Sequence, residues 1–308
     1  MELRHLRYFI AVAEEGSLSK AAERRLHTAQ PSLSRQIHDL EMEVGVKLFE
    51  RRPRGVALTA AGRIFLDHAR MALAQVETAG EAARRAEQPD KPVFVVGFLV
   101  GQEVPWLPET LRILREEAPG VEINFSSLAS PALALALMRG KVDVAFMRRE
   151  TQATGLIYKF LFKEPLIVIL PKGHRLAADK AIQPKQLARG IFIKPSLAAP
   201  VLRGVIDDYL QKTGIRVNAA YEGDNLSAIM SLVASTGGVA LCPVYAQNSL
   251  TAKVVARPIQ GVAPTIELVM GYNKSSTSPW LKRLLYRADE LVRSVHKQIS
   301  PTGTNQVL

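Results

Sequence analysis

Side chains that can bind base edges and phosphates are concentrated between residues 17 and 54 of this 308-residue chain. In the major groove, arginine can form paired hydrogen bonds with guanine, and glutamine can do so with adenine. Serine and threonine hydroxyls and arginines at a loop tip bind phosphate oxygens. The expected DNA-contacting set, including the proline that starts one helix, is Ser17, Thr28, Gln30, Pro31, Ser32, Ser34, Arg35, His38, Arg51, Arg52 and Arg54.

Three short helices are expected to position this set. The first is predicted by apolar residues at three- and four-residue steps: Leu3, Leu6, Phe9, Ile10 and Ala13. Gly16 should end that helix and Ser17 should cap the next, which reads 18–26 and has the small residues Ala21 and Ala22 on its inner face. After a turn at 27–29, a third helix is predicted for 30–45, with Pro31 in its first turn. Its inward face consists of Leu33, Ile37, Leu40 and Val44.

A basic hairpin is predicted after the third helix. Arg51, Arg52 and Arg54 surround a turn at Pro53 and Gly55, between two short β-prone segments. Such a tip fits a narrow minor groove or the DNA backbone. Exposed polar residues on one helix would equally fit an ordinary solvated subdomain. DNA binding is favoured instead by the order of the elements. A first helix is followed by a helix with small residues on its inner face, by a helix that starts with Gln30 and Pro31, and by a basic hairpin.

Residues from Met1 to about Pro92 resemble the DNA-binding and linker region of the LysR-type transcriptional regulators. The segments that match are LRHLRYFIAVAEEGSLSKAAE, QPSLSRQIHDLE and LFERRPRGVALTAAG. The resemblance implies a winged helix-turn-helix in residues 1–58 that binds double-stranded promoter DNA. One departure is visible in AAERRL, where three residues instead of two separate the paired alanines from the leucine. The extra residue, Arg24 or Arg25, is expected to lengthen the second helix or its turn.

A long linker helix is predicted over 59–91, with a hinge at 87–92. Strong helix formers without proline run from Thr59 to about Gln88 and carry a heptad seam: Phe65, Ala69, Ala72, Val76, Ala79 and Ala83. This stripe is expected to pair with a second copy of the chain, which would present two DNA-binding units to two half-sites. The alternative is packing against the chain's own C-terminal domain. The expected assembly is a homo-oligomer, a dimer of dimers.

Strands and helices alternate in residues 92–308, which indicates parallel sheets in an α/β domain. The predicted strands are 93–98, 121–126, 142–147, 165–171, 190–193, 217–221, 239–243 and 266–272, and the predicted helices are 104–117, 131–139, 201–212, 226–235 and 279–295. Two similar series suggest two lobes. The resemblance implies a two-lobed effector-binding domain like the periplasmic binding proteins, with lobe 1 at about 92–161 and 266–295 and lobe 2 at about 162–265.

Ligands of such sheets bind beyond the carboxyl ends of the strands, where helices begin. Applied here, this rule selects Leu99, Val100, Gly101, Gln102, Ser130, Arg148, Lys194, Pro195, Ser196 and Asn225. Ser130 is expected to cap a helix as well, and the resemblance implicates Ser130 and the loops at Gly101 and Pro195 in effector binding. Arg148 and Lys194 are the cations placed to meet an acid, with solvated surface as the alternative for each. The expected effector is a small carboxylate, and aromatic acids are among the candidates.

Charge and motifs limit the other classes of function. The net charge of +11 and the pI near 9.8 favour a polyanionic partner. The sequence contains no GxSxG, GxxxxGK[ST] or GxGxxG, so neither catalysis nor a cofactor is expected. The single cysteine, Cys242, excludes a Cys-based metal cluster and lies in an apolar run typical of a buried strand end, with a redox sensor as the alternative.

Location in the cell is expected to be cytoplasmic. Residues 1–13 are interrupted by charges and do not read as a signal peptide, and no apolar run is long enough to cross a bilayer. The absence of a secretion signal and the fused DNA-binding end count against a secreted solute-binding protein, which is the other class with a two-lobed domain. The sequence therefore predicts a cytoplasmic, effector-responsive LysR-type regulator.

Overall fold

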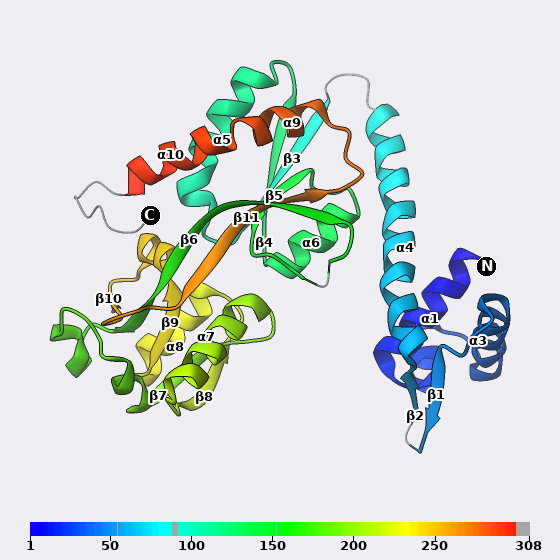
Figure 1. Ribbon diagram of the computed structural model, residues 1–308, viewed down its shortest axis with the longest axis horizontal. Coiled ribbons are helices and arrows are strands. Elements are labelled where there is room, and N and C mark those ends of the chain that lie inside the picture. Colours follow the sequence, from blue (N-terminus) through cyan, green and yellow to red (C-terminus); the bar gives the residue numbers. More distant parts are fainter. Residues whose placement is uncertain (54, 88–91, 152, 300–308) are drawn as a thin grey trace. The chain divides into compact units, whose positions relative to one another are not determined.

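The computed structural model describes residues 1–53, 55–87, 92–151 and 153–299. It contains two compact units, Met1–Ala86 and Glu87–Leu308 (Figure 1). Each unit has its own hydrophobic core, and each is described separately below. Among the described residues, none of the helices is both long and apolar enough to cross a membrane.

The first unit is a helical domain with a β-hairpin. Its elements are α1 (Leu3–Glu15), α2 (Leu18–Lys20), η1 (Ala21–Leu26), α3 (Gln30–Val44), β1 (Phe49–Arg52), β2 (Gly55–Leu58) and α4 (Ala60–Glu87). Phe9 of α1 lies at the centre of the core, with its ring centroid 5.0 Å from that of Phe49 and 5.0 Å from that of Phe65. These contacts join α1, the hairpin and α4, which confirms the three predicted helices and the hairpin.

The extra residue of AAERRL is accommodated in a π-helix. The six residues of η1 form a wider turn, and such a turn takes up one more residue than an α-helical turn. Ala21 and Ala22 stay buried, so the small inner face is kept. His27 ends the turn in the left-handed region at φ 46°, and α3 begins at Gln30 as predicted. The six-residue η1 ends at Leu26, before α3 begins, so the extra residue lies in the second helix and its turn.

The second unit contains two lobes with parallel strands. In lobe 1, β3 (Val93–Leu99) pairs in parallel with β4 (Glu122–Leu128) and with β5 (Val144–Met147). In lobe 2, β7 (Ile191–Pro195) pairs in parallel with β8 (Asn218–Gly223) and with β9 (Val239–Pro243). The two predicted βα series are thus confirmed. The short helical turns η2 (Arg175–Ala178), η3 (Pro184–Ala188) and η4 (Val244–Ser249) lie in lobe 2.

Two long strands cross between the lobes. β6 (Leu156–Pro171) pairs with β11 (Thr265–Asn273) through Pro165, and its second half pairs with β9 and β10 (Val254–Pro258). The sequence predicted only the second half of β6, because Lys159, Lys163 and Glu164 interrupt the apolar residues of the first half, and it did not predict β10. β11 returns to lobe 1 and pairs with β5, as the resemblance implied.

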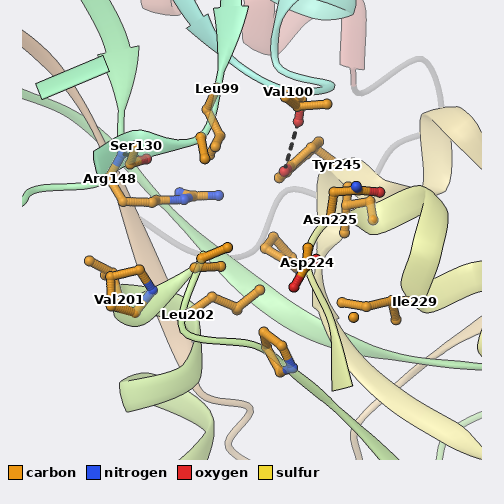
Figure 2. Close-up of a pocket in the computed structure, with 18 of the residues that line it drawn as sticks. Leu99, Val100, Ser130, Arg148, Val201, Leu202, Asp224, Asn225, Ile229 and Tyr245 are labelled. Atoms are coloured by element: carbon orange, nitrogen blue, oxygen red, sulfur yellow. Dashed lines mark hydrogen bonds between the residues drawn. The ribbon is translucent and has the colours of Figure 1, made fainter. Parts of the chain in front are cut away.

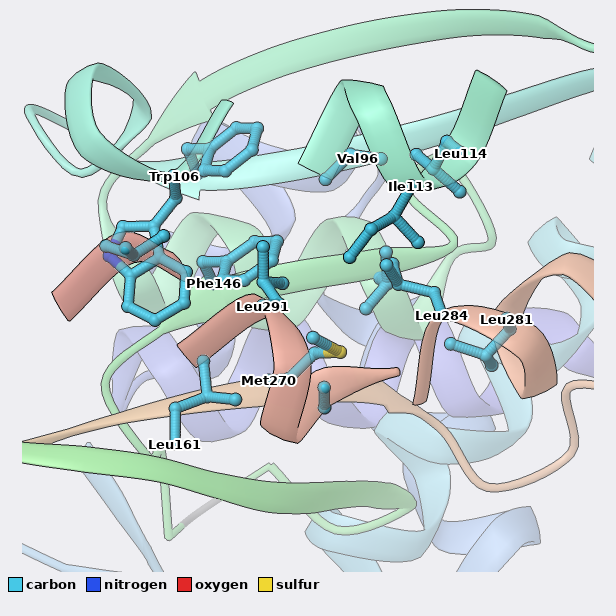
Figure 3. Packing of buried hydrophobic residues seen from close by; sticks show 14 of the residues in the cluster. Val96, Trp106, Ile113, Leu114, Phe146, Leu161, Met270, Leu281, Leu284 and Leu291 are labelled. Carbon is cyan, nitrogen blue, oxygen red and sulfur yellow. The ribbon is translucent and has the colours of Figure 1, made fainter. Parts of the chain in front are cut away.

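Helices cover both faces of each lobe. In lobe 1, α5 (Glu103–Glu117), α9 (Pro279–Tyr286) and α10 (Ala288–Ile299) pack on one face, and α6 (Ser130–Met138) packs on the other. Figure 3 shows Trp106 of α5 and Phe146 of β5 in the core beneath α5, α9 and α10; their ring centroids are 5.3 Å apart. In lobe 2, α7 (Pro200–Thr213) and α8 (Leu226–Thr236) cover opposite faces. The helix predicted for 279–295 is in fact two helices, divided at Arg287.

Candidate functional sites

The predicted recognition helix presents its polar residues on one side. The side chains of Gln30, Ser32, Arg35 and His38 are exposed, whereas Leu33, Ile37 and Leu40 are buried. Pro31 is exposed in the first turn, and Ser34 is half-buried. The N-cap residue Ala29 offers no side-chain acceptor, so the first N–H groups of α3 are available to a phosphate.

The residues before and after α3 complete this surface. The hydroxyl of Ser17 accepts a hydrogen bond from the Lys20 N–H at 3.4 Å, which confirms its role as a helix cap, and Thr28 is half-buried in the turn before α3. Arg51 and Arg52 are exposed on β1, and Arg52 forms an exposed ion pair with Glu50. Arg54, the third predicted arginine of the hairpin tip, lies outside the described residues.

Glu41 holds the hairpin against the recognition helix. This buried carboxylate of α3 accepts hydrogen bonds from the N–H groups of Leu48 and Phe49, at 2.9 and 3.1 Å, and from Lys47 Nζ at 2.7 Å. Burial alone would raise the pKa of Glu41, but these hydrogen bonds and the Lys47 charge together lower it. Gly55, at φ +136°, lets the hairpin approach α1, because a Cβ there would lie 2.2 Å from the Gly16 carbonyl oxygen.

The apolar seam of α4 divides into two parts. Phe65 and Ala69 pack into the core of the DNA-binding unit. Beyond them, the seam residues Ala72, Val76, Ala79 and Ala83 are exposed. Only the second part is therefore available to a partner helix. The hinge predicted for 87–92 falls mostly on residues 88–91, which lie outside the described residues.

A pocket of about 630 Å³, counting its open mouth, lies between the two lobes of the second unit (Figure 2). Six of the ten predicted effector residues line it: Leu99, Val100, Ser130, Arg148, Pro195 and Asn225. The rest of the lining comes from Ala129, Glu150, Ala198, Ala199, Pro200, Val201, Leu202, Gly223, Asp224, Leu226, Ile229, Pro243 and Tyr245. Most of these side chains are aliphatic, which is typical of a small-molecule site with a few polar groups that fix orientation.

Ser130 positions the strand end beside it. Its hydroxyl is buried and accepts a hydrogen bond from the Arg148 N–H at 2.9 Å. The N-cap residue of α6 is Ala129, and no side chain caps that helix. The prediction that the Ser130 hydroxyl caps the helix is therefore wrong. The hydroxyl bridges to β5 instead and keeps its own proton to donate.

Arg148 is buried at 4 % exposure and is already ion-paired. One of its Nη atoms donates to Glu164 Oε1 at 2.6 Å, and the other donates to the Glu267 carbonyl oxygen at 2.8 Å. Glu164 is 1 % exposed and also accepts from the Gln102 amide at 3.2 Å. These contacts fix the position of the Arg148 guanidinium, and Glu164 balances its charge. A guanidinium has five N–H groups, so Arg148 still has donors for a ligand in the pocket.

Four predicted effector residues do not line the pocket. Lys194 donates to Asp207 Oδ1 at 2.5 Å, so the expected second cation is an ion pair on lobe 2. The Ser196 hydroxyl accepts from the Ala198 N–H within its own loop. Gln102 is fully buried behind the pocket, and Gly101 lies against the Tyr245 ring. The strand-end rule located these loops but could not determine which of their side chains face inward.

Sequence reasoning missed Glu150, Asp224 and Tyr245. Tyr245 follows β9 and Asp224 follows β8, so the same strand-end rule could have found both. Burial raises the pKa of the Tyr245 hydroxyl, which stays protonated. One carboxyl oxygen of Glu150 is sealed without a hydrogen-bond partner, and burial raises the pKa of this group as well.

Three helices begin at the pocket. Ser130 starts α6, Pro200 starts α7, and Asn225 caps α8 by accepting from the Ala228 N–H at 2.9 Å. The partial positive charge at each of these N-termini favours an anionic group.

Cys242 is buried on β9, and burial raises the pKa of its thiol to about 12, which supports the structural interpretation of this residue.

Comparisons with known families match both units. Residues 3–63 match the model for the bacterial regulatory helix-turn-helix proteins of the lysR family, and residues 87–291 match the LysR substrate binding domain. The Hca operon transcriptional activator HcaR of Escherichia coli is 40 % identical over 299 residues, which cover 96 % of this chain and 99 % of HcaR. The regulator AlsR of Bacillus subtilis is 34 % identical, over 93 % of this chain and 95 % of AlsR.

Solved structures agree with this match over the whole length. Full-length BenM superposes with a TM-score of 0.57 at 27 % identity, covering 99 % of this chain and 100 % of that one. Full-length CbnR in complex with its target DNA gives a TM-score of 0.54 at 26 % identity, covering 95 % and 100 % of the two chains. The fold inferred from the sequence is thereby confirmed.

Proposed function

The chain belongs to the LysR family of transcriptional regulators, and from this premise we propose that a small carboxylate bound between the two lobes controls its activity at a promoter. Proteins of this family bind promoter DNA and assemble as oligomers; they are not enzymes. Residues 1–58 would form the DNA-binding domain, 59–91 the linker helix and 92–308 the effector domain. A cytoplasmic location follows from the DNA partner.

For DNA reading, we propose that α3 enters the major groove. Its exposed residues Gln30, Ser32 and Arg35 lie on the side opposite the buried core positions. Arg35 would then contact a base edge, while Arg52 on the hairpin would contact the backbone. Ser17 and Thr28, at the ends of the preceding helix, are suited to phosphates.

For assembly, we propose that the exposed part of the α4 seam pairs with the same part of a second copy. Ala72, Val76 and Ala79 form a strip of small side chains that lets two helices approach closely. Two such pairs would form the dimer of dimers.

The effector proposal rests on a single arrangement: the Arg148 guanidinium, the Ser130 hydroxyl and three helix N-termini meet in one apolar pocket. A carboxylate there would accept hydrogen bonds from the remaining Arg148 N–H groups and from Ser130. The aliphatic lining would bury the rest of the molecule, at about 25 cal/mol for each Å² of apolar surface. An aromatic ring is one group that fits this lining.

A thermal-shift screen of small acids tests this proposal. A ligand that binds only the native state raises the apparent stability in proportion to the logarithm of its concentration. At least one acid should raise the Tm of the wild type and of Lys194→Ala, since Lys194 lies outside the pocket lining. The same acid should have a much weaker effect on Ser130→Val. An equal effect on all three proteins would place the acid elsewhere.

A further inference from the structure

The charges around the pocket do not suit a simple monoanion. Arg148 is the only cation among the described residues that line it, and Glu164 balances that charge. The lining also carries two acidic residues, Glu150 and Asp224. A carboxylate ligand would therefore bring one more negative charge into a site whose cation is already balanced.

The two acidic residues differ in their surroundings. One oxygen of Glu150 is sealed from solvent with no hydrogen bond, and burial raises the pKa of the group. The Asp224 side chain is exposed, and the structure gives its carboxylate no hydrogen bond or ion pair with any described residue. Asp224 is therefore the charged acceptor that a ligand would meet.

Asp224 and Arg148 face the pocket from different lobes. Arg148 follows β5 in lobe 1, whereas Asp224 lies between β8 and α8 in lobe 2. Figure 2 shows the Arg148 guanidinium extending from the lobe 1 side and Asp224 approaching from the lobe 2 side. The side-chain Oδ1 of the neighbouring Asn225 already accepts the cap hydrogen bond of α8, so Asp224 is the charged side-chain acceptor of this wall.

We propose that the effector carries a hydrogen-bond donor, a hydroxyl or an amino group, in addition to its acid group. Lobe 1 binds the acid through Arg148 and Ser130, and lobe 2 accepts the donor through Asp224. This inference rests on the proposed function, because it assumes that an acid binds in this pocket. A site that must hydrogen-bond a ligand group rejects the analogue that lacks it, because its own polar group is then left unpaired.

Isothermal calorimetry on the full-length protein tests the proposal. The probes are benzoate, phenylacetate and 3-phenylpropionate, each beside its ring-hydroxylated and ring-aminated analogues. This series varies the separation of acid and donor. The proteins are the wild type, Asp224→Ala and, as a matched control, Asp208→Ala, which changes an exposed carboxylate of α7 outside the pocket lining.

At least one analogue should bind the wild type and Asp208→Ala tenfold or more tightly than its parent acid. Asp224→Ala should lose this preference while binding the parent acid at least as well as the wild type does, since a negative charge is removed. Equal binding of parents and analogues, or a preference kept in Asp224→Ala, would overturn this inference and leave an acid-binding site. If no acid in the series bound any of the proteins, the proposed function would fail, and this inference with it.

Discussion

Tyr245 of lobe 2 donates a hydrogen bond to the Val100 carbonyl oxygen of lobe 1, with an oxygen–oxygen distance of 3.3 Å. Its backbone N–H donates to Glu164 Oε2 on the crossing strand β6 at 3.2 Å. The ring lies against Gly101, where a Cβ would be 2.9 Å from the Tyr245 Cε2 atom. One side chain of the pocket wall therefore links both lobes.

Removing this link should loosen the lobes. Tyr245→Phe keeps the ring and deletes one hydrogen bond, which contributes about 0.5–1.5 kcal/mol. Gly101→Ala should have a larger effect, because it introduces a Cβ into the ring contact at a backbone φ of +88°. Small-angle X-ray scattering and thermal unfolding of the two variants would show a broader lobe arrangement and a lower Tm. Gly120→Ala, which has a similar φ and open space around it, is the control for backbone strain alone.

Breaking the buried pair of Arg148 and Glu164 should cost more stability than breaking an exposed pair on the same strand. Glu164→Ala leaves a buried guanidinium without its counter-charge, a change that typically costs about 3–5 kcal/mol. The exposed pair of Lys163 and Glu267 is a matched control, for which Glu267→Ala should cost about 0–1 kcal/mol. Urea unfolding gives both values. Similar small losses in the two variants would mean that solvent reaches Arg148.

Glu41 should make the stability of the DNA-binding unit depend on pH. Its pKa is lowered in the folded state, so its contribution is present above the unfolded pKa of about 4.3 and is lost as the pH falls through the folded value. Glu41→Gln should therefore lower the Tm at neutral pH, and the difference from the wild type should shrink below about pH 4. If the Tm difference between the two proteins stayed constant from neutral pH to below about pH 4, the charge of the Glu41 carboxylate would not contribute to stability.

The recognition helix and the hairpin should contribute differently to DNA binding. Arg35→Ala should cost about 1–3 kcal/mol and relax the base preference at one position, whereas Arg52→Ala should weaken binding to all sequences more evenly. Competition binding against single-base variants of a selected site separates the two effects. Unchanged affinity and preference in Arg35→Ala would mean that η1 directs α3 differently from the proposed docking.

The exposed half of the α4 seam should control oligomerisation. Ala72→Glu and Ala79→Glu together would place charges in a close-packed helix pair without compensating partners. We expect lower mass by multi-angle light scattering and lower DNA affinity, with the near-UV circular dichroism of the protein unchanged. The neighbouring residues Glu77 and Thr78 are not substituted in this variant. A mass equal to that of the wild type would show that these alanines do not face a partner.

The sequence predicted elements more reliably than it predicted the contacts of individual side chains. Local patterns determine where Gly16, Ser17 and Pro31 end, cap and start helices, and these positions agree with the structure. The strand-end rule found the loops of the pocket for the same reason. The pairing of Arg148 with Glu164 joins the residue after β5 to a residue of β6, and no periodicity in the chain indicates it.

The departures have physical causes. The first half of β6 was missed because Lys159, Lys163 and Glu164 interrupt its apolar residues, and this half is only partly buried. Ser130 was assigned to a helix cap because a proline follows it, yet its hydroxyl lies closer to the backbone of β5. Lys194 was expected to bind a ligand, but its Nζ donates a hydrogen bond to Asp207 of α7 instead. Each departure depends on a contact between distant segments.

Transcription from a cognate promoter, measured over a range of effector concentrations for the wild type and Ser130→Val, is the most direct test of effector control through the pocket. Valine removes the acceptor of the Arg148 N–H and the hydroxyl available to a carboxylate, without touching the DNA-binding unit. We predict equal promoter affinity for both proteins, and a response in Ser130→Val that is lost or requires at least tenfold more effector. An unchanged response would contradict the account, and so would a loss of promoter binding together with the response.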